Sequence, residues 1–157
     1  MKNIVWTRID DRLVHGQVMT QWVQYTKANE VLIVDDAVAE DSFLQMVMKA
    51  SMPSSIALKV QNEKQAVNYL TETSKDEKII LLVKTPTTLD RLTDAGVELL
   101  TVNVGGIGSK AGRKKLYKNI AASEEEREAF RNLLKKGIDV FFQVIITESR
   151  EDVKDYL

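Results

Sequence analysis

The chain has 157 residues, of which 44% are hydrophobic and 29% charged, a balance typical of one globular domain. Its net charge of −1 excludes the general basic footprint of a nucleic-acid-binding protein, so we expect no nucleic-acid partner. The absence of cysteine excludes disulfides, zinc–thiolate sites and thiol catalysis, and fits a reducing compartment. The first residues contain no long apolar stretch, so we expect no signal peptide, and no apolar run is long enough to cross a bilayer. We expect a single domain over residues 1–157.

Short apolar segments alternate with amphipathic ones along the chain. The apolar segments predict strands at 3–9, 31–36, 55–60, 78–84, 97–106 and 138–146. Their nearly continuous apolar character is typical of strands covered on both faces, as in a parallel sheet. Helical patterns follow at 14–23, 41–51, 63–74, 86–96 and 123–137, with a terminal helix expected at 149–157. This alternation predicts an α/β fold, an open and mostly parallel sheet with helices on both faces.

Helix boundaries are marked most clearly in the second half of the chain. Pro86 opens one predicted helix and Gly96 closes it. Ser123 followed by Glu126 forms a capping-box pattern, and Gly137 stands where that helix should end. The apolar spacing also predicts that Trp6, Trp22, Met46, Met48 and Met52 pack in the core.

The segment TRIDDRLVHG, residues 7–16, contains the only histidine of the chain. It joins the first predicted strand to the first predicted helix, and ligands of such sheets collect beyond the carboxyl ends of the strands. Asp10 or Asp11 can cap the following helix, whose free N–H groups favour an anion. We therefore expect His15 at the mouth of this helix or in the loop before it.

The charges around the histidine indicate phosphoryl transfer. Arg8 and Arg12 can each hold phosphate oxygens through two parallel hydrogen bonds. An imidazole among them is placed to attack a phosphoryl group, and Gly16 leaves space beside the ring. Asp10 can orient an arginine, or the ring nitrogen opposite the attacking one.

The same residues also have simpler interpretations. A lone histidine is often a surface or core residue, and Arg–Asp pairs on a loop are often weak surface ion pairs. A metal site is disfavoured because the chain has no second histidine and no cysteine to share the ion. A Ser-His-Asp hydrolase lacks the G-x-S-x-G elbow. We expect neither a metal nor a cofactor.

Three further segments follow strands and could contribute to a site. Gly105 and Gly106 belong to a glycine-rich stretch that matches no nucleotide-binding pattern, so it is a permissive turn or a ligand contact near His15. Lys84 and Thr85 could donate to a phosphoryl group or remain solvated. Asp35 and Asp36 could position Arg12 or cap the helix that follows them.

The most basic stretch of the chain lies between the fifth and sixth predicted strands. It is either a solvated face or a docking surface for an acidic partner. Its cations are Lys110, Arg113, Lys114, Lys115 and Lys118.

The stretch RIDDRLVHGQV followed by Trp22 resembles the signature loop of the enzyme IIB component of the mannose/fructose/sorbose class of the sugar phosphotransferase system. The resemblance extends over the whole chain. It includes VDDAVAED at 34–41, LLVKTP at 81–86, DAGV at 94–97, VNVGG at 102–106 and GIDVFFQV at 137–144.

This resemblance implies a cytoplasmic phosphocarrier at the membrane transporter. His15 would accept a phosphoryl group on Nδ1 from a phosphohistidine of enzyme IIA. It would pass the group to a sugar held by the membrane components IIC and IID during uptake. Arg12 would stabilise the phosphoryl group, with Arg8 and Asp10 shaping the loop. The sugar pocket would lie in the membrane partners, so this chain would not identify the sugar.

Two other functions remain open from the sequence. A nucleotide- or flavin-binding module would use the Gly105–Gly108 loop and tolerate loss of His15. A regulatory protein would keep a phosphorylatable His15 without passing the group onward.

Overall fold

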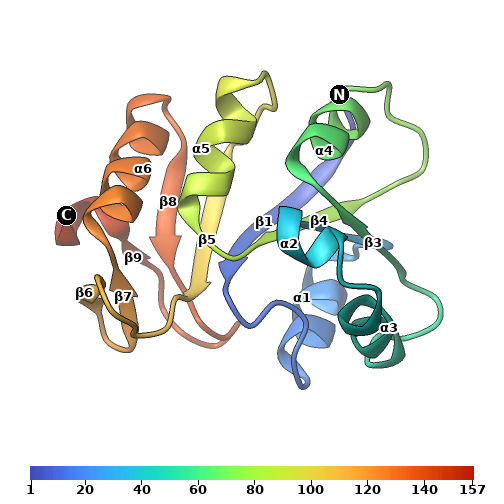
Figure 1. Ribbon diagram of the computed structural model, residues 1–157, viewed down its shortest axis with the longest axis horizontal. Helices are drawn as coiled ribbons and strands as arrows, with labels where there is room; N and C mark the ends of the chain where they lie inside the picture. Colours follow the sequence, from blue (N-terminus) through green and yellow to red (C-terminus); the bar gives the residue numbers. More distant parts are fainter.

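The computed structural model describes residues 1–157 as one α/β domain built on a seven-stranded sheet (Figure 1). The strands, in chain order, are β1 (Ile4–Asp10), β2 (Glu30–Val34), β3 (Ala57–Gln61), β4 (Ile79–Val83), β5 (Thr101–Gly106), β8 (Asp139–Phe142) and β9 (Glu151–Asp152). Their spatial order is β3-β2-β4-β1-β5-β8-β9, and all neighbouring pairs are parallel except β8 with β9. The predicted fold class is therefore confirmed.

Helices cover both faces of the sheet. They are α1 (Val18–Thr26), α2 (Asp36–Ala39), α3 (Ser42–Ala50), α4 (Glu63–Leu70), α5 (Pro86–Asp94) and α6 (Glu124–Lys135). A separate hydrophobic core cluster lies on each face of the sheet. One joins α4, α5 and α6 to one face, and the other joins α1, α2 and α3 to the opposite face. Alternation along β4 shows the division, because Leu81 belongs to the first cluster and Ile80 and Leu82 to the second.

The predicted helix boundaries hold where the capping signals are strong. Pro86 occupies the first turn of α5, and Gly96 follows its end with φ +107°. Ser123 and Glu126 form a complete capping box at α6, and Gly137 follows that helix with φ +83°. Both glycines adopt the left-handed conformation that glycine tolerates best.

The structure differs from the sequence-based picture in three places. The tail forms the short strand β9 and a 3₁₀ helix (Val153–Tyr156) in place of one terminal helix. A hairpin of β6 (Lys114–Tyr117) and β7 (Ile120–Ala122) occupies the basic stretch, where we predicted no strand. Met46 is 61% exposed because it lies on the solvent side of α3, whereas Met48 and Met52 are buried.

The connections of β1 and β5 create a crevice at one edge of the sheet. These neighbouring strands are parallel, yet the chain leaves β1 for α1 on one face and leaves β5 for α6 on the other. Ligand sites of open α/β sheets form where adjacent connections diverge in this way. Figure 1 shows the loop after β1 at the lower edge, beyond the arrowheads of β1, β5 and β8.

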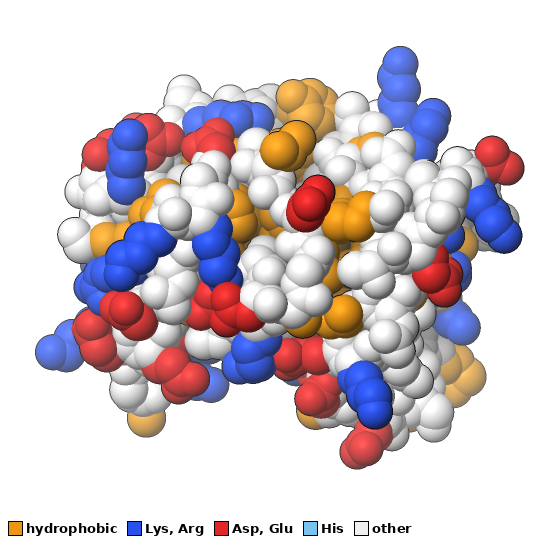
Figure 2. Space-filling view, turned by 90° about the horizontal axis from the view of Figure 1, so that it is seen from above, with side chains coloured by type: hydrophobic (Ala, Val, Ile, Leu, Met, Phe, Trp, Pro, Cys, Tyr) orange, Lys and Arg blue, Asp and Glu red, His pale blue; other side chains and the backbone are white.

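The opposite side of the molecule, where the amino ends of β1 and β5 lie, carries a different surface. A hollow of about 430 Å³ lies there between residues 1–7 and 98–101. Figure 2 looks onto this edge and shows hydrophobic side chains between charged ones, with no histidine in view. No helix of the molecule is both long and apolar enough to pass through a membrane.

Candidate functional site

The loop between β1 and α1 holds His15 in a preformed conformation. Leu13 has φ +57° and Gly16 has φ +50°, so the chain cannot continue as a helix through this segment. Leu13 donates its backbone N–H to the carbonyl of Asp10, and its side chain is buried beside that of Val14. Two buried anchors thus immediately precede His15, whose side chain is 26% exposed.

The helix after this loop begins later than the sequence suggested. Gln17 precedes α1 without any side-chain cap, so neither Asp10 nor Asp11 caps it. Val14 lies in the loop outside the helix, because the left-handed residues Leu13 and Gly16 flank it. The position of His15 in the loop before the helix is confirmed.

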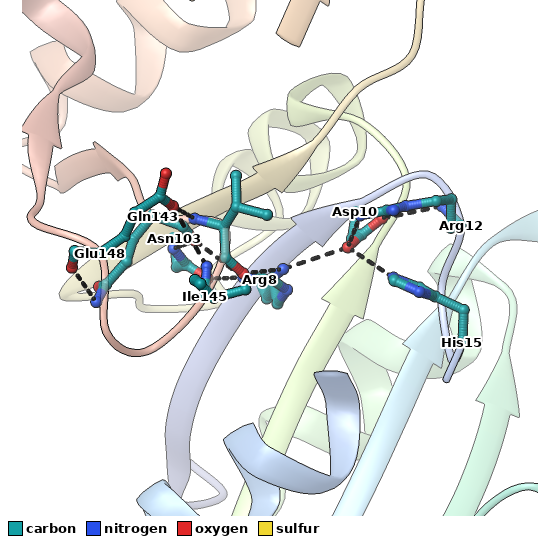
Figure 3. Close-up of polar contacts among 9 residues, drawn as sticks. Arg8, Asp10, Arg12, His15, Asn103, Gln143, Ile145 and Glu148 are labelled. Carbon is teal, nitrogen blue, oxygen red and sulfur yellow. Dashed lines mark hydrogen bonds and ion pairs between the residues drawn. The ribbon is translucent and has the colours of Figure 1, made fainter. Parts of the chain in front are cut away.

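The Asp10 carboxylate connects the charged side chains of the site (Figure 3). Its Oδ2 accepts from His15 Nε2 at 3.1 Å, from Arg8 Nη2 at 3.3 Å and from Arg12 Nη2 at 3.3 Å. Its Oδ1 accepts from the backbone N–H of Arg12 at 3.1 Å and from Arg12 Nε at 3.2 Å. Asp10 therefore orients both an arginine and the imidazole, which leaves Nδ1 of His15 free of protein partners.

Electrostatics keep Asp10 ionised. Burial alone would raise the pKa of this carboxyl, since its side chain is 1% exposed. Hydrogen bonds from Arg12 and His15 and the charge of Arg8 outweigh burial and hold the pKa of Asp10 below its ordinary value. The carboxylate therefore acts as an acceptor at neutral pH.

Arg8 is fully buried and supports Asp10 from beneath. Its Nη1 donates to Asn103 Oδ1 at 2.6 Å and to the carbonyl of Gln143 at 3.1 Å. Its Nη2 donates to the carbonyl of Val144 at 2.9 Å as well as to Asp10. Burial lowers the pKa of Arg8, while Asp10 opposes that effect. With 0% exposure, Arg8 is a supporting residue and offers no N–H group to the surface.

Arg12 is the exposed cation of the site, with 54% of its side chain accessible. Its Nε and Nη2 engage both oxygens of Asp10, so this edge of the guanidinium already has a carboxylate partner. Its Nη1 forms no hydrogen bond within the protein. The outward edge of Arg12 is therefore the part available to an anion.

Gly105 and Gly106, the last two residues of β5, pack against the charged side chains that surround Asp10. A Cβ at Gly105 would lie 2.1 Å from Arg8 Cζ, so the guanidinium rests directly on the Gly105 backbone. A Cβ at Gly106 would lie 3.1 Å from Asp10 Oδ1 and 3.3 Å from Arg12 Nη2. The small size of both residues therefore lets β5 approach the charged side chains of β1.

Asp11 connects the loop between β1 and α1, which contains His15, to the glycine loop, Gly105–Gly108. Its Oδ2 accepts from the backbone N–H of Gly108 at 2.7 Å, and its own N–H donates to the carbonyl of Gly106 at 3.0 Å. Arg113 lies 3.6 Å from the same Oδ2 and forms two hydrogen bonds with Glu126. Asp11 is thus a structural link from its own loop to Gly106 and Gly108 and, through Arg113, to α6.

A cavity of about 490 Å³ opens beside Arg12, between the divergent loops after β1 and β5. Its walls combine the glycine loop with apolar and charged side chains from the hairpin and the loop after β8. The lining residues are Asp11, Arg12, Gly105, Gly106, Ile107, Gly108, Lys118, Asn119, Ile120, Val144, Ile145 and Glu148.

Lys84 and Thr85 form no hydrogen bond or ion pair with the histidine cluster. Lys84 Nζ lies 3.9 Å from Asp35, and Thr85 shares a hydrogen bond with Thr87. Asp35 also accepts from the backbone N–H of Val38, so it caps α2 and does not position Arg12. A phosphoryl contact from Lys84 or Thr85 stays a prediction.

The basic stretch divides into exposed and buried cations. Lys110, Lys114 and Lys115 are exposed, and Lys118 pairs with Glu148 at 3.2 Å. Arg113 is the exception, with a side chain that is 6% exposed and bound to Glu126. It is therefore structural and does not belong to a solvated face.

Asn103 is the site residue that the sequence analysis missed. It is 1% exposed in β5, where its register partner on β1 is Arg8. The signal was present, because an asparagine between two valines of a buried strand must find polar partners.

Comparisons with known proteins find relatives along nearly the whole chain. A family model described as "PTS system sorbose subfamily IIB component" matches residues 4–157. The N-acetylgalactosamine-specific phosphotransferase enzyme IIB component 2 of Escherichia coli K12 is 34% identical, with 98% of each chain covered. The mannose-specific EIIAB component of the same organism is 30% identical over 96% of this chain but only 47% of its own length.

Solved structures share the fold closely. The IIBSor domain of the sorbose permease from Klebsiella pneumoniae superposes with a TM-score of 0.92 at 28% identity, covering 98% of this chain and 95% of that one. From the family match and these relatives, this chain belongs to the sorbose subfamily of IIB components of the sugar phosphotransferase system, which are phosphotransferases of sugar uptake.

Proposed function

We propose that His15 carries the phosphoryl group of this phosphotransferase on Nδ1. The observation that supports this assignment is the 3.1 Å contact between Asp10 and Nε2. A carboxylate acceptor favours the tautomer with the proton on Nε2, which leaves the lone pair of Nδ1 for attack on phosphorus.

The donor in this proposal is a phosphohistidine of enzyme IIA. The phosphorus–nitrogen bond of the donor breaks as the bond to Nδ1 of His15 forms, and the donor imidazole leaves. The fusion of IIA and IIB implied by the name of the E. coli mannose-specific EIIAB relative supports this choice of donor. Positioning and charge stabilisation are the main requirements of such a transfer.

Arg12 stabilises the transferring group. Its side chain is 54% exposed beside His15 and keeps an unused Nη1 edge, whereas Arg8 is buried. Arg8 and Asp10 instead hold the loop and the ring. Gly105 and Gly106 shape the site through their packing against these side chains.

The second transfer delivers the phosphoryl group to a sugar. The bond from Nδ1 to phosphorus breaks and its electron pair returns to Nδ1, a bond from a sugar hydroxyl oxygen to phosphorus forms, and the hydroxyl proton passes to solvent. The sugar would be held by membrane components IIC and IID, so this chain would work on the cytoplasmic side, peripherally attached to them.

Incubation with a labelled phosphodonor and candidate IIA proteins tests the proposal. We expect one phosphoryl group that is labile in acid and stable in base, as a phosphoramidate is. The His15→Ala variant should fold normally and remain unlabelled, because the chain contains no other histidine. Acid-labile label on that variant would refute the assignment.

A further inference from the structure

Asn103 forms no hydrogen bond with His15 or Asp10, yet it lies at the base of the hydrogen-bonded chain that ends on the histidine. Its Oδ1 accepts from Arg8 Nη1 at 2.6 Å, and its Nδ2 donates to the carbonyl of Gln143 at 2.9 Å. That carbonyl also accepts from Arg8 Nη1 at 3.1 Å. Asn103, Arg8 and the Gln143 carbonyl thus form a closed triangle inside the protein (Figure 3).

The triangle fixes the direction of the Arg8 guanidinium. Its flat face lies against the Gly105 backbone, and Cζ is 5.2 Å from the ring centre of Trp22. With Nη1 held by Asn103 and Gln143, the Nη2 group points to Val144 and to Asp10. Asn103 therefore determines which edge of Arg8 reaches Asp10.

The direction of Arg8 matters because one oxygen of Asp10 serves both Arg8 and the imidazole. Arg8 Nη2 and His15 Nε2 donate to the same Oδ2, at 3.3 and 3.1 Å. A rotation of the guanidinium would release this carboxylate from its buried support and leave its contact with the ring less defined.

We propose that Asn103 is a positioning residue for His15, which acts through Arg8 and Asp10 to hold the ring in the tautomer that frees Nδ1. Its action is indirect, through two intervening side chains, and it touches no reacting atom. This inference goes beyond the proposed function. The expected effect on the His15 tautomer is independent of that function, and only the expected effect on phosphorylation rests on it.

The single histidine makes the proposal measurable, because ring ¹⁵N resonances arise from His15 alone. The spectrum is recorded at a pH well above the ordinary histidine pKa of about 6.5, where the neutral tautomers are distinguished. We expect the wild type to carry its proton almost wholly on Nε2. In Asn103→Ser, which removes the contacts with Arg8 and Gln143, we expect both tautomers.

A second variant separates positioning from packing. Asn103→Asp keeps an oxygen acceptor for Arg8 Nη1, replaces the donor to the Gln143 carbonyl with a second oxygen, and adds a negative charge beside Arg8. Because Nη1 is still held by an oxygen at position 103, this variant should retain the wild-type tautomer. The matched control is Asn132→Ser in α6, which removes a 2.9 Å hydrogen bond to Asp90 on the other side of the sheet. This control should leave the His15 resonances unchanged.

Phosphorylation provides the kinetic arm. Loss of a partner that orients a metal-ligating side chain typically costs about 10- to 100-fold in activity, and for the analogous orientation of His15 we expect a loss of this size in Asn103→Ser. A folded Asn103→Ser protein with the wild-type tautomer would overturn the proposal, as would a folded Asn103→Asp protein with mixed tautomers. Failure of the wild type to be phosphorylated would refute the proposed function and leave the tautomer result to judge Asn103.

Discussion

At the scale of single residues, Asp10 couples a buried cation to the surface. Arg8 is fully buried, and Asp10 is the only carboxylate in contact with it. Asp10→Asn keeps the shape of the side chain but leaves Arg8 without a counter-charge. We expect a loss of about 3 to 5 kcal/mol in the free energy of unfolding, the usual cost of breaking a buried pair from one side. Urea denaturation measures it, and a loss below about 1 kcal/mol would show that the carbonyls of Gln143 and Val144 suffice for Arg8.

Arg12→Lys tests the exposed cation. Lysine keeps the charge but cannot present a planar fork to Asp10 or to phosphate oxygens. We expect phosphoryl transfer to slow by on the order of tenfold to a thousandfold, as with the removal of one donor to a transition state. Stopped-flow or quench-flow labelling measures the rate, with Arg131→Lys on α6 as a control. Equal rates in the Arg12 variant and the wild type would exclude Arg12 as a phosphoryl contact.

Gly105→Ala tests the packing of Arg8 on β5. The added Cβ would lie 2.1 Å from the centre of a buried guanidinium, so Arg8 must move. We expect lower stability and mixed His15 tautomers, whereas Gly112→Ala, which meets no atom within 4 Å but is strained by φ +86°, should change stability alone. Calorimetry and the ring ¹⁵N spectrum check the two effects. An unperturbed spectrum in Gly105→Ala would show that the position of Arg8 does not control the tautomer of the His15 ring.

At the scale of secondary-structure elements, the hairpin β6–β7 presents Lys114 and Lys115, two exposed cations of the basic stretch. Reversal of Lys114 and Lys115 to Glu should slow phosphorylation by enzyme IIA, most clearly at low salt, because exposed charges steer an approaching partner. Stability should barely change, since both side chains are exposed. The measurement is the phosphorylation rate against ionic strength. If the curves of the variant and the wild type coincide over the whole range, the hairpin is a solvated face and takes no part in docking.

The sequence predicted the elements that local patterns specify. The apolar strands, the capping box at Ser123 and the stop at Gly96 depend on neighbouring residues, and each appears in the structure. The short strands β6, β7 and β9 lack this local signal, because they depend on tertiary partners such as β8. The late start of α1 was hidden for a similar reason, since the left-handed conformation of Leu13 is stabilised by burial and not by residue type.

The candidate site was predictable as a set of residues but not as a network. Arg8, Asp10, Arg12 and His15 stand together in one motif, and the structure brings them together. Their division into a buried and an exposed arginine depends on β5, which is about 95 residues away in sequence. Asn103 and Gly105 could be connected with Arg8 only through the register of two strands.

At the scale of the whole molecule, paired carboxylates determine stability in acid. Hydrogen bonds and nearby cations outweigh burial at Asp10, Asp90, Glu126 and Glu148 and lower the pKa of each below its ordinary value of 3.8 or 4.5. The folded state therefore binds fewer protons than the unfolded state in this range. The resulting stability is present in full above the ordinary values and is lost as the pH falls through the lowered ones.

Denaturation between pH 7 and pH 2 checks this expectation. The free energy of unfolding should stay nearly constant down to about pH 5 and then fall steadily. Glu126→Gln should flatten part of that fall, because it removes one lowered carboxyl from the set. A protein as stable at pH 3 as at pH 7 would contradict the expectation.

The contact between Arg12 and Asp10 has a consequence for energy coupling in the proposed carrier. Both oxygens of Asp10 occupy one edge of the Arg12 guanidinium, so an incoming phosphoryl group meets a cation that already has an internal anionic competitor. Competition from Asp10 weakens the binding of the phosphoryl group by Arg12 but does not abolish it. Because a weakly bound phosphoryl group retains more of its transfer potential, the Asp10 carboxylate helps the phosphorylated protein to pass the group to its acceptor.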